Sequence, residues 1–151
     1  MFAGNQEGKT ECGAAEFAYH LTGLYPEWWT GLRFNRPVRA IYGSESGATT
    51  RDTAQVKLFG EEGQLGTGYL PKHTISGTIN AKGTTGLYES ATIKHVSGGE
   101  SKLFQRSYDQ GRKKWASLSN IDIAWPDEEP PWDIWEEMIT RLNAGNDGNG
   151  G

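Results

Sequence analysis

The 151-residue sequence has a single cysteine, no apolar run of membrane-spanning length and no excess of positive charge. One cysteine, Cys12, excludes an intrachain disulfide framework and suits a reducing compartment. The lack of a long apolar segment or leader excludes a transmembrane span and a signal peptide, so we expect a cytosolic protein. The net charge of −4 gives no overall attraction to nucleic acid, and any such contact needs a local basic face.

The opening residues carry the pattern of a phosphate-binding loop. In such a loop, backbone N–H groups surround the β- and γ-phosphates of a nucleotide, a lysine adds positive charge, and a hydroxyl reaches Mg²⁺. The following residues 11–21 predict a helix with an apolar face, so the loop has its expected downstream context. An ordinary Gly-rich turn before a helix is the alternative. The residues that match the loop pattern are Ala3, Gly4, Asn5, Gln6, Glu7, Gly8, Lys9 and Thr10.

The middle of the chain predicts alternating strands and helices. Residues 36–43 alternate apolar and polar side chains, as a strand does, and residues 50–59 predict a helix that ends at Gly60. Residues 61–86 are dense in Gly, Thr and Lys and predict an irregular connection with a short strand at 73–75. Residues 90–96 and 102–108 predict a hairpin with a Gly-containing loop.

Several basic and aromatic side chains have two interpretations. Arg51 either reaches a phosphate, also as an arginine finger toward a neighbouring subunit, or is an exposed or salt-bridged arginine. The hairpin face with Lys94 and the basic segment 112–114 either contact DNA or are solvated. Trp28 and Trp29 either pack against the first helix or sheet edge, or form an adenine-stacking or partner surface.

A short apolar run ends in the acidic pair Asp127–Glu128. Phosphate-loop ATPases need such a strand, because it carries an Asp to the Mg²⁺ shell and a Glu toward the attacking water. The stretch of chain after Lys9 leaves room for one α/β domain between the two motifs. An acidic loop before a helix is the alternative. Residues 131–142 then predict an amphipathic helix with an apolar face formed by Trp132, Trp135, Ile139 and Leu142.

Many segments, in this order, resemble the large terminase subunits of tailed bacteriophages. The similarity runs from Phe2 to about Arg141 and includes AGNQEGKT, LTGLYPEWWTGLRFNRPVRA, TTRDTAQVKLFG, GTGYLPK, HVSGGESKLFQRSYDQGRKKW, DEEPP and WEEMITR. The resemblance implies an ATPase motor, with ATP and Mg²⁺ as cofactors, that packages double-stranded viral DNA into a procapsid. It also implies a ring of subunits in the host cytoplasm that works with the portal protein and the small terminase subunit.

The resemblance assigns roles to the two motifs. It implies that residues 3–10 hold the phosphates, that Thr10 and Asp127 share the Mg²⁺, and that Lys9 and Glu128 are catalytic, with Glu128 activating the water. The implied fold is α/β, a P-loop NTPase of the RecA-like three-layer α/β/α type with an inserted β-hairpin. We expect this partial ATPase domain over residues 1–143, followed by a flexible tail at 144–151.

Three departures from the family pattern qualify this interpretation. Pro126 precedes Asp127, where a residue that donates to the sheet is more usual, so we expect a distorted strand end. The strand expected before Ala3 is missing, as are the coupling segment and the nuclease domain expected after Asn143. We therefore expect a truncated ATPase domain that hydrolyses ATP poorly. The alternatives are a non-catalytic remnant or assembly module that binds nucleotide or terminase, and another P-loop motor such as a helicase.

Overall fold

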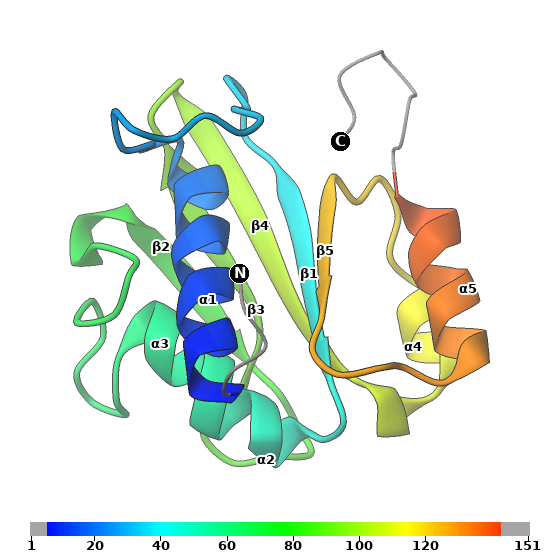
Figure 1. Ribbon diagram of the computed structural model, residues 1–151. Coiled ribbons are helices and arrows are strands. Elements are labelled where there is room, and N and C mark those ends of the chain that lie inside the picture. Colours follow the sequence, from blue (N-terminus) through cyan, green and yellow to red (C-terminus); the bar gives the residue numbers. More distant parts are fainter. Residues whose placement is uncertain (1–5, 143–151) are drawn as a thin grey trace.

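A computed structural model describes residues 6–142 of the chain (Figure 1). Ala3, Gly4, Asn5 and the predicted tail 144–151 lie outside the described residues, as do the side chains of Gln6 and Glu7. The described elements are α1 (Gln6–Thr22), β1 (Arg39–Ser44), α2 (Gly47–Thr50), a π-helical turn (Arg51–Gln55), α3 (Val56–Phe59), a 3₁₀ turn (Lys72–Thr74), β2 (Ile75–Asn80), β3 (Tyr88–His95), β4 (Gly99–Ser107), a second 3₁₀ turn (Tyr108–Gln110), α4 (Arg112–Ala116), β5 (Ile123–Pro126) and α5 (Trp132–Arg141).

The strands form one mixed sheet in the order β2-β3-β4-β1-β5. The pairs β2–β3 and β3–β4 are antiparallel, whereas β1 pairs in parallel with both β4 and β5. The predicted hairpin is confirmed as β3 and β4. It is not an insertion, however, because β4 also pairs with β1 and so stands in the middle of the sheet. The described chain is therefore a mixed α/β protein.

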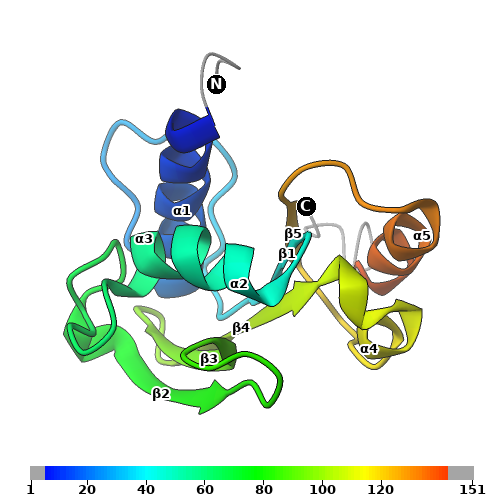
Figure 2. The same cartoon turned by 90° about the horizontal axis from the view of Figure 1, so that it is seen from below.

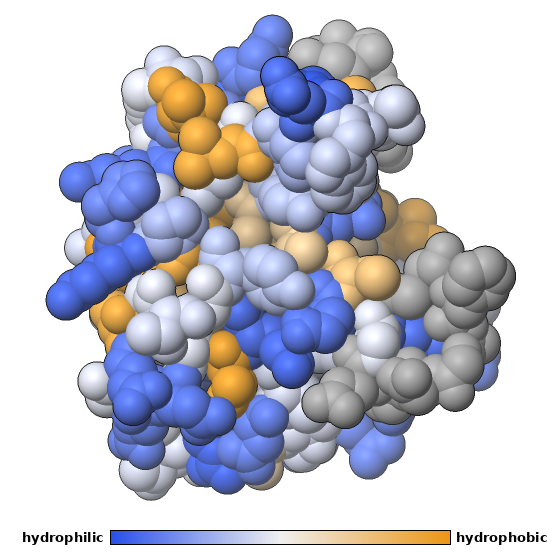
Figure 3. Space-filling model, turned by 60° about the vertical axis from the view of Figure 1, so that its left-hand side comes forward, coloured by the Kyte–Doolittle hydropathy of each residue, from blue (hydrophilic) through white to orange (hydrophobic). Residues whose placement is uncertain are grey.

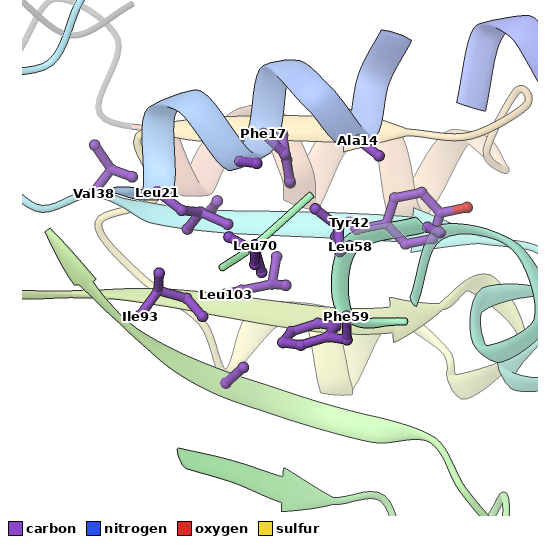
Figure 4. Packing of buried hydrophobic residues seen from close by; sticks show 14 of the residues in the cluster. Ala14, Phe17, Leu21, Val38, Tyr42, Leu58, Phe59, Leu70, Ile93 and Leu103 are labelled. Carbon is purple, nitrogen blue, oxygen red and sulfur yellow. The ribbon is translucent and has the colours of Figure 1, made fainter. Parts of the chain in front are cut away.

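α1 covers one face of this sheet with the apolar face that the sequence predicts. Ala14, Phe17, Ala18 and Leu21 are all buried, and they pack with side chains from β1, β3, β4 and α3 (Figure 4). The helix ends at Thr22 and is followed by Gly23, whose φ of 78° lies in the left-handed region that suits glycine. The main core therefore lies between α1, α3 and the sheet.

On the other face of the sheet, α4 and α5 pack beside β1 and β5, together with Phe104 of β4 (Figure 2). Side chains alternate along β1, so Ala40 and Tyr42 belong to the core under α1, whereas Ile41 belongs to a second cluster with Trp115 and Ile134. Successive side chains of β1 therefore pack alternately beneath α1 on one face of the sheet and against α4 and α5 on the other.

The predicted apolar face of α5 is wrong except at Leu142, which packs against the second cluster. Trp132 is 72% exposed and Ile139 is 51% exposed, whereas Ile134 and Met138 are buried. Glu137 lies on the buried side as well, because Arg112 of α4 and Arg141 of α5 both pair with its carboxylate. The helix therefore presents two tryptophans, Trp132 and Trp135, to the outside.

Two further elements differ from the sequence-based boundaries. The second helical segment begins earlier, at Gly47, because Ser46 accepts a hydrogen bond from Thr49 N–H as an N-cap. The strand expected at 73–75 instead runs over β2, after the 3₁₀ turn. No helix within residues 6–142 is long and apolar enough to cross a bilayer. On the face shown in Figure 3, hydrophobic side chains lie in separate places among hydrophilic ones.

Candidate nucleotide-binding edge

The N-terminal turns of α1 lie at the edge of the sheet where β1, β4 and β5 have their carboxyl ends. At the far end of α1, Leu21 O accepts a hydrogen bond of 2.7 Å from Ser101 Oγ near the start of β4. One turn after Lys9, Gly13 lies against the indole of Trp125 near the end of β5. α1 thus runs opposite to the three parallel strands. Open α/β sheets bind ligands at this edge, and helix N-termini attract anions there.

β5 carries the predicted acidic pair to the same edge. By the register of the parallel ladder, Gly43 of β1 is paired with Pro126, which has no N–H to donate. Asp127 N–H donates to Gly43 O instead, at 2.8 Å. The ladder therefore continues past the proline, and Asp127 is tied to β1 through its own backbone.

Two tyrosine hydroxyls that the sequence reasoning missed contact this acidic pair. Tyr42 of β1 is fully buried and donates to Asp127 Oδ2 at 2.6 Å. Tyr108, directly after β4, donates toward the carbonyls of Gly43, Asp127 and Glu128 at 3.2, 3.0 and 3.3 Å. Glu128 has a φ of 66°, which is uncommon for a residue with a side chain. The Tyr108 hydroxyl therefore supports the unusual turn at Glu128.

Both hydroxyls remain protonated donors in this setting. Burial raises the pKa of Tyr42, and the hydrogen bond to the Asp127 carboxylate raises it further. Burial also raises the pKa of Tyr108, with a second contribution from the carboxylates of Asp127 and Glu128. A negative phenolate beside these carboxylates is therefore disfavoured, and each tyrosine keeps the proton that it donates.

Glu128 itself faces solvent. Its side chain is exposed and lines cavities of about 390 and 360 Å³. The larger cavity is also lined by Pro126, Trp132 and Trp135, and the smaller one by Tyr108. A water molecule can therefore approach the Glu128 carboxylate, as the predicted role requires.

The predicted loop is wrong over its described part: α1 begins at Gln6, five residues before the helix expected over 11–21, so residues 6–10 are helical. Lys9 is exposed and Thr10 is 5% exposed, and both lie in the first turns of α1. The Thr10 hydroxyl and the Asp127 carboxylate carry oxygen atoms, the type of donor that Mg²⁺ prefers. Within residues 6–142, His, Cys, Asp and Glu side chains form no group of three that could hold a metal ion. The donor set fits a Mg²⁺ ion that takes its other ligands from phosphates and water, as this ion commonly does.

Arg51 and Trp29 take the simpler of their interpretations, whereas Trp28 is 69% exposed. Arg51 is salt-bridged to Asp52 at 2.8 Å and also donates to Thr85 O at 2.9 Å. Trp29 packs against Tyr19 and His20 of α1. Because Trp28 and Trp29 follow the C-terminal end of α1, a helix of about 25 Å separates them from the N-terminal turns, which argues against adenine stacking.

The three basic residues 112–114 differ in what surrounds their side chains. Arg112 pairs with Glu137 at 2.6 Å and so joins α4 to α5. Lys113 and Lys114 are exposed, as is Lys94 on the hairpin. Their exposure suits both interpretations, a solvated face and a DNA contact.

The chain is a mixed α/β protein in which α1, the helix that carries Gly8, Lys9 and Thr10, contacts β5, the strand that leads into Asp127 and Glu128. The chain belongs to the family described as "Terminase large subunit, T4likevirus-type, N-terminal", which matches residues 1–149. It is also 37% identical, over 163 aligned positions, to the "Terminase, large subunit" of Salmonella phage P22. That alignment covers 95% of this chain and 32% of the P22 protein, so the chain spans about a third of the length of this relative. No solved structure matches. The resemblance noted in the sequence is confirmed.

Proposed function

We propose that the chain is part of the ATPase domain of a large terminase subunit, the motor that packages double-stranded viral DNA into procapsids. The observation that carries this proposal is the meeting of the α1 N-terminal turns and the Asp127–Glu128 pair at one edge of the sheet. A P-loop NTPase fold accounts for that arrangement. Membership of the terminase family supports the motor role, with DNA, the portal protein, the small subunit and a ring of copies as partners.

Each residue of the edge has a distinct part in this proposal. The N-terminal turns of α1 attract phosphate through the helix dipole, and Lys9 adds a positive charge. Thr10 and Asp127 offer oxygen ligands to Mg²⁺. Bound Mg²⁺ supplies charge neutralisation at the β- and γ-phosphate oxygens. Glu128, exposed beside its cavities, orients the attacking water and accepts its proton.

Calorimetric titration with ATP in the presence of Mg²⁺ tests the binding part of the proposal. We expect the chain to bind ATP and the Lys9→Ala variant to lose that binding, because the lysine charge acts on the phosphates. Lys113→Ala is the matched control, since it removes an exposed lysine from α4. Absence of binding by the unaltered chain, or equal binding by Lys9→Ala, contradicts the proposal.

Turnover separates an ATPase from a non-catalytic nucleotide-binding module. We expect Glu128→Gln to bind ATP as the unaltered chain does but to hydrolyse it more slowly, because the amide cannot accept the proton of the water. Equal hydrolysis rates in the two proteins indicate that this glutamate has no catalytic part. Glu129→Gln, which changes the next carboxylate in the sequence, is the control.

A further inference from the structure

Tyr42 is built into the sheet so that its hydroxyl meets the Asp127 carboxylate. It lies on β1 and is paired in register with Trp125, two residues before Asp127. Its ring contacts the Trp125 indole edge to face, with 4.7 Å between ring centroids. The side chain is completely buried. Packing therefore restricts the tyrosine to one position, from which the hydroxyl reaches Asp127 Oδ2.

The hydrogen bond between these two groups is short, at 2.6 Å, and one partner is a carboxylate. Charge-assisted hydrogen bonds of this kind are stronger than neutral ones. Since Asp127 N–H is also bound to Gly43 O, the residue is held by β1 at its backbone and at one carboxylate oxygen. Both restraints come from the same strand, so the plane of the carboxylate follows the position of β1.

We propose that Tyr42 is a positioning residue that orients the Asp127 carboxylate toward Mg²⁺ in the nucleotide site. This inference rests on the proposed function, because it needs Asp127 to act as a metal ligand. The tyrosine acts through Asp127 and makes no contact with the metal or the nucleotide. Groups that orient a metal ligand change metal affinity by roughly 10- to 100-fold when they are removed.

The test is the Tyr42→Phe variant, which removes only the hydroxyl. ATP binding is measured by calorimetry at a series of Mg²⁺ concentrations and also without metal. We expect the Mg²⁺ concentration for half-maximal binding to rise about tenfold or more, and ATP binding without Mg²⁺ to stay unchanged. Tyr25→Phe is the matched control, because the Tyr25 hydroxyl accepts from Phe34 N–H at 2.7 Å, beyond the opposite end of α1.

A second pair of variants separates positioning from a general loss of stability. In an Asp127→Ala background, Tyr42→Phe should cause no further change in Mg²⁺ dependence, because the ligand that it orients is gone. An unchanged Mg²⁺ dependence in Tyr42→Phe alone, or the same shift in the Asp127→Ala background, overturns the inference. If the unaltered chain binds no ATP, the proposed function fails and this inference fails with it. ATP binding with an unshifted Tyr42→Phe overturns only the inference.

Discussion

Replacing Gly13 by alanine tests the contact that joins α1 to β5. A Cβ added at this position lies 2.4 Å from Trp125 Cζ2 and 2.8 Å from Cη2. The indole is partly buried and packs edge to face against Phe17 and Tyr42, so a shift away from the new methyl group disturbs both contacts. Overpacking of a core costs about 1–3 kcal/mol. Alanine gains about 1 kcal/mol over glycine within a helix. We therefore expect a net destabilisation of up to about 2 kcal/mol.

The sign of this change is decisive, because helix propensity alone predicts stabilisation. Urea unfolding followed by far-ultraviolet circular dichroism gives the free energy of unfolding. In a Trp125→Phe background the atoms that meet the new methyl group are absent, so the same Gly13→Ala change should stabilise by about 1 kcal/mol. Gly83→Ala, where an added Cβ meets nothing within 4 Å, is the control. Stabilisation by Gly13→Ala in the unaltered background would refute this packing.

Two further predictions concern buried ionisable groups. Burial lowers the pKa of His95 below its ordinary value of 6.5. The folded protein therefore resists protonation of this histidine, and its free energy of unfolding falls as the pH drops from 6.5 toward the folded-state pKa. The urea midpoint should therefore fall less steeply on acidification in His95→Gln than in the unaltered chain, whereas the exposed His73→Gln should keep the original slope. Glu137→Gln should lower the urea midpoint more than Glu136→Gln, because two arginines pair closely with the buried Glu137 and one lies 3.7 Å from the more exposed Glu136. Equal effects of the two glutamine substitutions would contradict the geometry.

Local periodicity predicted the elements whose burial depends on a single face. The apolar side chains of α1 recur with the helical repeat and face one sheet, so the pattern indicates the buried side directly. The two strands of the hairpin likewise alternate between a buried face and a partly exposed one. In these elements, the information needed for the prediction lies within one short segment.

α5 shows where this reasoning fails. Its tryptophans suggest an apolar face, but the buried side contains Glu137, which hydropathy alone assigns to solvent. The carboxylate is buried because Arg112, 25 residues earlier in the chain, donates to it at 2.6 Å. A buried charge is tolerated when it is paired and hydrogen-bonded. Arg112 lies on another helix and outside any local window, so its part in burying Glu137 could not be predicted from the sequence of α5 alone.

Part of the candidate site is likewise indicated by a short segment of sequence, and part depends on residues that are far apart in the chain. The Asp127–Glu128 pair was predictable, since an apolar run and two adjacent carboxylates form a short motif. Tyr42 and Tyr108 were not, because they are 85 and 19 residues from Asp127 in the chain. Only the parallel pairing of β1 with β5 places Tyr42 beside that carboxylate. A motif thus identifies the candidate site groups, whereas the register between strands determines which side chains lie beside them. For this reason, a change in β1 that leaves both motifs intact should still alter the response to Mg²⁺.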